Sequence, residues 1–127
     1  MLQVLLVGFG GAVGAVGRYG VSVAVGRLWE TAFPLGTMIV NIVGSLAMGL
    51  LVGLLARLLP PHQQEIRLFV AVGVLGGFTT FSSFSLDAIT LIERGEWNQA
   101  LLYAVLSVVV SIPALYVGLL ITRGAGA

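Results

Sequence analysis

The chain has 127 residues, of which 58% are hydrophobic and only 9% are charged, and its mean hydropathy is +1.09. Soluble domains carry about 25% charged residues, so this composition excludes an ordinary soluble fold and indicates a single integral membrane domain over residues 1–127. The formal net charge of +1 gives no support for nucleic-acid binding, and the absence of cysteine excludes disulfides and thiolate metal sites. The charge-free runs predict an all-α protein with four transmembrane helices, at about residues 3–27, 34–57, 66–94 and 97–122.

The first predicted span contains one charge at membrane depth, that of Arg18. A charge in lipid costs roughly 3 kcal/mol on insertion scales and therefore requires a partner, a wet cavity or a route to the interface. Gly10, Gly14 and Gly17 of the same span form a smooth face for close helix contact. We expect Arg18 either to hold the carbonyls of a broken helix or to contact an ion.

The second and fourth spans each carry one polar stripe. Polar side chains recur at every fourth position, which places them on one helix face. They are Thr37, Asn41 and Ser45 in the second span and Tyr103, Ser107 and Ser111 in the fourth. Such a stripe either joins helices by hydrogen bonds or lines a polar pathway, and for Asn41 both interpretations stay open.

Residues 76–85 of the third span differ from an ordinary membrane helix. Adjacent glycines weaken a helix by about 1 kcal/mol each relative to alanine, and five hydroxyl residues follow them. We therefore predict that the Gly76–Gly77 pair breaks the helix near residues 76–80, where freed backbone groups need partners or a cavity. Phe81 and Phe84 share one helix face and either pack in the core or present positive ring edges to an anion.

Positive charges are almost evenly divided between the two predicted membrane faces. Arg57, Arg67 and Arg123 lie on the side of the termini, and Arg27 and Arg94 lie on the other. This distribution gives almost no positive-inside bias. The chain is therefore compatible with insertion in either orientation and with a dimer of two oppositely inserted copies.

The titratable residues do not form a recognisable catalytic set. No acid lies at catalytic spacing from the single histidine, no base is within local reach of a serine, and no nucleotide-binding motif is present. An enzyme is therefore disfavoured. The neutral hydroxyl and amide donors in the spans suit a different task, which is to replace the water around a small anion without holding it too tightly.

Two segments resemble the small bacterial fluoride channels of the Fluc/CrcB family. GGFTTFSSF, at residues 76–84, is similar to the family signature GG-x-TTFSTF, with Ser83 where threonine is usual. PLGTMIVNIVG, at residues 34–44, is similar to the second-helix pattern around its asparagine. The resemblance covers essentially the whole chain. It implies a channel that exports toxic fluoride passively across the bacterial inner membrane, built as an antiparallel, dual-topology homodimer with two pores.

The resemblance also implies roles for individual residues. A structural, non-transported Na⁺ at the dimer centre would be held by the backbone carbonyls of Gly76 and Thr79, and Arg18 would brace the break. The fluoride pathway would be lined by Thr37, Asn41, Phe81, Ser83, Phe84, Tyr103, Ser107 and Ser111.

Two other functions remain open at this point. A small dual-topology, proton-coupled exporter needs a titratable acid in its substrate cavity, and the first, second and fourth spans contain none. In a non-transporting membrane assembly protein, the polar stripes would only join helices. The partners predicted for the favoured function are the fluoride ion, a second copy of the chain and the lipid bilayer.

Overall fold

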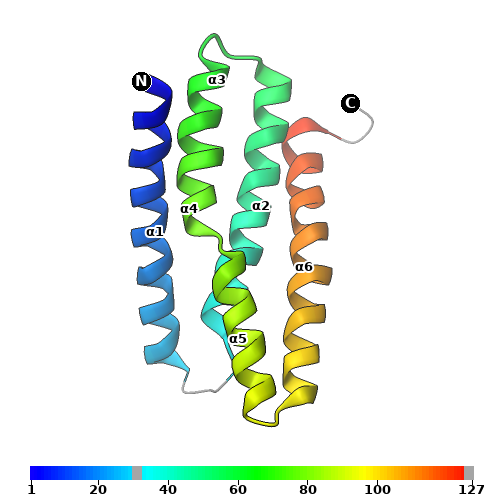
Figure 1. Ribbon diagram of the computed structural model, residues 1–127. Helices are drawn as coiled ribbons and strands as arrows, with labels where there is room; N and C mark the ends of the chain where they lie inside the picture. The colour runs from blue at the N-terminus through cyan, green and yellow to red at the C-terminus, as the bar shows by residue number, and fades with distance from the viewer. Residues whose placement is uncertain (30–32, 125–127) are drawn as a thin grey trace.

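The computed structural model describes residues 1–29 and 33–124 and is helical throughout its regular structure. Within these residues, four segments are long and apolar enough to cross a membrane: α1 (Leu2–Leu28), α2 (Leu35–Leu58), the composite segment Gln63–Glu93 and α6 (Trp97–Arg123). They stand side by side, with the beginning of α1 and the end of α6 at the same end of the bundle (Figure 1). The prediction of an all-α, multi-pass membrane fold is confirmed.

The third span is assembled from several short helices. It begins with α3 (Gln63–Ile66) and continues through the π-helix η1 (Arg67–Leu75) into α4 (Gly76–Phe78). The chain then becomes extended at Thr79 (φ −83°, ψ 158°) and Thr80 (φ −154°, ψ 126°) before α5 (Phe81–Glu93) begins. Figure 1 shows the resulting step between α4 and α5.

The cause predicted for this break is wrong. Gly76 has helical angles (φ −63°, ψ −38°), and Gly77 also lies within α4. Gly77 instead permits close packing, because a Cβ there would lie 2.5 Å from the carbonyl oxygen of Gly11 in α1. The helix is interrupted just after the glycines, at Thr79 and Thr80.

Glycines also set the other close helix contacts. A Cβ at Gly73 would lie 2.9 Å from the Cα of Gly10, so α1 and η1 meet backbone to backbone. Gly49 of α2 and Gly118 of α6 approach each other's helix backbones in the same way. Close approach of this kind favours helix association in lipid, where no hydrophobic effect drives helices together.

A small buried cluster lies where α5 meets the first half of α6. It contains Leu91, Ala100 and Tyr103, and Phe33 and Phe84 pack against it. Tyr103 is 0% exposed. Many large apolar side chains on the outer faces of the helices are exposed, as expected for a surface that meets lipid or another membrane chain.

Candidate functional site

The break in the third span is held by a side chain from α2. The amide oxygen of Asn41 accepts the Thr80 backbone N–H at 2.8 Å, and its Nδ2 donates to the Thr80 carbonyl oxygen at 3.0 Å. The asparagine amide therefore replaces the bonds that a continuous helix would make at Thr80. Two hydrogens sit on Nδ2, so one donor remains after this pairing.

Thr80 is also the N-cap residue of α5. Its Oγ1 accepts the backbone N–H of Ser83 at 3.2 Å, which is the N-cap bond typical of threonine. The hydroxyl of Ser82 forms a hydrogen bond with the hydroxyl of Thr80, with the two oxygens 3.1 Å apart. Ser83 thus takes part in the site through its backbone, and its side chain does not line the pocket next to the break.

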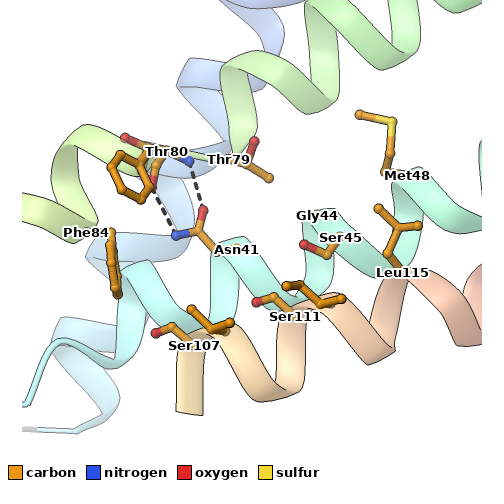
Figure 2. Close-up of a pocket in the computed structure, with 13 residues that line it drawn as sticks. Asn41, Gly44, Ser45, Met48, Thr79, Thr80, Phe84, Ser107, Ser111 and Leu115 are labelled. Atoms are coloured by element: carbon orange, nitrogen blue, oxygen red, sulfur yellow. Dashed lines mark hydrogen bonds between the residues drawn. The ribbon is translucent and has the colours of Figure 1, made fainter. Parts of the chain in front are cut away.

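A pocket of about 350 Å³ lies beside the break, between α2, α5 and α6. Figure 2 shows Asn41 and Ser45 facing it from α2, with Ser107 and Ser111 on the facing side of α6. The lining residues are Asn41, Gly44, Ser45, Met48, Thr79, Thr80, Phe81, Phe84, Ser107, Val108, Ser111, Ile112 and Leu115. The structure therefore brings together five of the eight residues predicted for an anion pathway.

Two hydroxyls in this pocket have no partner. The Oγ atoms of Ser107 and Ser111 are buried and make no hydrogen bond within the described residues, and Ser107 as a whole is only 6% exposed. An unpaired buried polar group costs roughly 1–3 kcal/mol, so such groups are usually satisfied. These hydroxyls are thus placed to bind something that enters the pocket.

Aromatic rings form one end of the pocket. The rings of Phe81 and Phe84 are 5.6 Å apart with planes tilted by 40°, and Phe84 lies 5.1 Å from the ring of Tyr103. Phe84 is partly buried, whereas Phe81 is 78% exposed and projects from the chain. The Phe81 ring therefore has its outer face open on the surface of the single chain.

Thr37 and Tyr103 do not line this pocket. Thr37 lines a second cavity of about 240 Å³, together with Ser22, Trp29, Phe33 and Asp87 among others. The hydroxyl of Tyr103 donates to Asp87 Oδ2 at 3.1 Å. Tyr103 and Phe84 pack together between the residues of the two cavities, so the predicted polar path is divided in the single chain.

Arg18 faces the break from α1. Its Nε donates to the carbonyl oxygen of Gly77 at 3.2 Å, and the bond is partly buried. No ion pair involves Arg18 within the described part of the chain. Its full positive charge therefore lies one residue from the end of α4.

The carbonyl groups of Gly76 and Thr79 are left without backbone donors. The Thr80 N–H, which would bond to Gly76 in a continuous helix, is taken by Asn41. Across residues 1–29 and 33–124, no amide donates to the carbonyl oxygens of Gly76 or Thr79. Neutral oxygens of this kind are suitable ligands for a hard cation.

Three features of the site were not predicted. Thr80 is the backbone partner of Asn41, Gly44 admits the methyl group of Thr79 where any Cβ would clash, and Asp87 bonds to Tyr103. The Thr-Thr pair next to the glycines was visible in the sequence, but its long-range partner was not. The glycine at residue 44 lies three positions after Asn41, and only the fold shows what it faces.

Comparison with known proteins places the chain in a family. The model of the family described as "CrcB-like protein, Camphor Resistance (CrcB)" matches residues 5–119. This chain belongs to the CrcB family. The predicted family membership is confirmed by the match.

CrcB-family relatives are similar over nearly their whole length. One from Agrobacterium fabrum is 54% identical over 123 residues, covering 97% of this chain and 98% of the relative. Another from Hyphomonas neptunium is 52% identical over 119 residues, covering 94% of each, and one from Rhodospirillum centenum is 49% identical over 125 residues, covering 98% of each. All three are named "Fluoride-specific ion channel FluC". The expectation that the chain is not an enzyme is confirmed, since these relatives are ion channels.

Proposed function

We propose that this CrcB-family chain forms a fluoride-selective channel that releases toxic fluoride passively across the inner membrane of a bacterium. The observation that carries the proposal is the pair of unpaired, buried hydroxyls of Ser107 and Ser111 in the pocket beside the break. Fluoride is small and strongly hydrated, so a pore must replace its water with short, neutral donors. The names of the relatives support fluoride as the transported ion.

Each donor in the pocket has a defined role in this proposal. The hydroxyls of Ser107 and Ser111 and the remaining N–H of Asn41 bind fluoride in place of water. Phe81 and Phe84 present positive ring edges to the anion. The charge of Arg18 makes the potential near the break more positive and so favours an anion. Thr37 and Tyr103 extend the path from the second cavity.

The functional unit is an antiparallel homodimer with two pores. The exposed ring of Phe81 supports this assembly, because a channel wall needs a second chain to enclose that ring. The even distribution of arginines over the two membrane faces is compatible with opposite insertion. One pocket in each chain gives two pores in the dimer.

A structural Na⁺ fits the carbonyls of Gly76 and Thr79, which lack backbone donors within the described residues. Two carbonyl oxygens from one chain are too few for a hard cation, so both copies would contribute ligands. When bound, the ion supplies positive charge near the anion path and neutralises the carbonyl dipoles. The chain's own contribution is to keep these oxygens free. Asn41 binds the Thr80 N–H, which would otherwise bond to Gly76, and Thr80 Oγ1 binds the Ser83 N–H, which would otherwise bond to Thr79.

A proton-coupled exporter is the second candidate, because Asp87 provides one acid beside the second cavity. Efflux of fluoride from liposomes, followed with a fluoride electrode, separates the two. A channel releases fluoride down its gradient when a protonophore has removed any proton gradient. An exporter requires the proton gradient, and a membrane assembly protein gives no flux in either condition.

A further inference from the structure

The ends of α2 and α6 form a basic corner that the proposed fluoride function does not use. Arg57 lies in the last turn of α2, and Arg123 lies in the last turn of α6. The Nη1 of Arg57 donates to the carbonyl oxygen of Thr122 at 3.4 Å, and Thr122 directly precedes Arg123 in the chain. Gly53 brings the two helices together there, since a Cβ at Gly53 would lie 3.0 Å from the Arg123 backbone nitrogen. Figure 1 shows these two helix ends side by side.

Neither guanidinium group is neutralised by the described residues. No carboxylate in those residues lies within 4.0 Å of Arg57 or Arg123. The Nε of Arg123 is buried and has no hydrogen-bond acceptor among residues 1–29 and 33–124, although charged donors are costly to bury unpaired. Capping of α6 accounts for one N–H of Arg57. This cap does not account for the other N–H groups of Arg57 or for the buried Nε of Arg123.

The surroundings of the corner are apolar and exposed. Leu54 and Leu58 of α2 and Ile121 of α6 are all exposed large hydrophobic residues close to the two arginines in sequence. Helix ends of this length reach the headgroup layer of a bilayer. A lipid bound here would therefore have its phosphate at the arginines and its acyl chains along the leucines and Ile121.

We propose that Arg57 and Arg123 form a binding site for the phosphate group of an anionic phospholipid. The planar guanidinium fork matches phosphate oxygens in a bidentate manner, and basic pockets between membrane helices are known to hold anionic headgroups. An inorganic phosphate ion has the same oxygen chemistry but no acyl chains. The exposed apolar residues around the corner favour the lipid.

The site is tested by the thermal stability of the purified protein in neutral detergent with phosphatidylglycerol or phosphatidylcholine added. A ligand that binds only the folded state raises the melting temperature. We expect phosphatidylglycerol to raise it more than phosphatidylcholine in the wild type. In the double variant Arg57→Gln, Arg123→Gln, we expect affinity for phosphatidylglycerol, measured by native mass spectrometry, to fall by about tenfold or more. Arg67→Gln, an exposed arginine at the same end of the bundle, should bind as the wild type does.

Wild-type affinity in the double variant would overturn the lipid site. An equal loss of affinity in Arg67→Gln would also overturn it, because it would indicate an effect of general surface charge. Inorganic phosphate added with phosphatidylcholine distinguishes the source of the phosphate. If inorganic phosphate stabilises the wild type as well as phosphatidylglycerol does, the lipid proposal is wrong.

A second variant serves if the double glutamine variant does not fold. The double variant Arg57→Lys, Arg123→Lys keeps both charges but lacks the guanidinium fork, and we expect its affinity for phosphatidylglycerol to be lower than that of the wild type. Equal binding by that variant counts against the guanidinium fork. All of these measurements are independent of fluoride flux.

Discussion

The side-chain amide of Asn41 forms two hydrogen bonds with the backbone of Thr80, one to its N–H at 2.8 Å and one to its carbonyl oxygen at 3.0 Å. It thus takes the place of a peptide group and stabilises the extended backbone between α4 and α5. Asn41 also lines the pocket, and its amide has one N–H left after the pairing with Thr80. The two interpretations of Asn41, a link between helices and a pathway residue, are therefore compatible in one side chain.

Replacing Asn41 by Asp tests this double role. The carboxylate cannot donate to the Thr80 carbonyl and places a negative charge beside the pocket, so we expect fluoride efflux to fall at least about 100-fold. Efflux from liposomes measures the effect. Asn98→Asp, the same change at an exposed position in the first turn of α6, serves as the control and should conduct normally. Normal conduction in Asn41→Asp would limit Asn41 to a structural role.

The serine hydroxyls give a prediction in which stability and function separate. Because the Oγ atoms of Ser107 and Ser111 have no partner within the described residues, Ser107→Ala and Ser111→Ala lose no internal hydrogen bond. We expect the melting temperature to stay the same or rise, while fluoride efflux falls by about tenfold for the pair. Thr90→Val is the matched control, since it removes a hydroxyl that bonds to the Leu86 carbonyl at 2.8 Å and does not line the pocket. Full efflux in the double alanine variant would contradict the proposed anion ligands.

Replacing Phe84 by Ile removes a ring edge and keeps an apolar side chain. We expect fluoride efflux to fall by about tenfold or more, while the protein elutes at the same volume as the wild type, because the proposed anion contact is aromatic and not hydrophobic. Loss of the contact with Tyr103 should destabilise the fold by about 1 kcal/mol. Phe9→Ile, at an exposed position of α1, gives the same chemical change outside the pocket. The ring-edge argument fails if Phe84→Ile conducts like Phe9→Ile.

The packing of α1 on α4 gives a prediction about stability. A methyl group at Gly77 would lie 2.5 Å from the Gly11 carbonyl oxygen, so Gly77→Ala must push the two helices apart. We expect a loss of about 1–3 kcal/mol in the free energy of unfolding, seen as a lower melting temperature. At Gly8, nothing lies within 4 Å of an added Cβ, and Gly8→Ala should be neutral or slightly stabilising. A stable Gly77→Ala protein would show that the close contact is unimportant.

The sequence was sufficient to predict the helical class, the four spans and the pocket residues on the polar stripes, because these depend on composition and on the helical period. It predicted the break within residues 76–80, where Thr79 and Thr80 are indeed extended, but it attributed the break to the glycines because helix propensity is local. Gly76 and Gly77 remain helical since packing on α1 outweighs their low propensity. The extended residues are specified by Asn41, which lies 39 positions before Thr80 and has no local signature.

The polar stripes were also only partly informative. Equal spacing predicted that Thr37 and Asn41 share a face, yet they line different cavities, because a pocket is closed by side chains from other helices. The bond between Tyr103 and Asp87 joins α5 to α6 across a separation of 16 residues. No spacing rule within either helix could have indicated it.

The dependence of the break on Asn41 has a consequence for how the protein is made. Residues 63–93 alone contain nothing that binds the N–H and carbonyl of Thr80, so in lipid an isolated third segment satisfies these groups by continuing as one straight helix. During synthesis, α2 leaves the ribosome before Thr80 does. We therefore expect the step between α4 and α5 to form only when the third segment docks on α2, because Asn41 supplies the partners of Thr80.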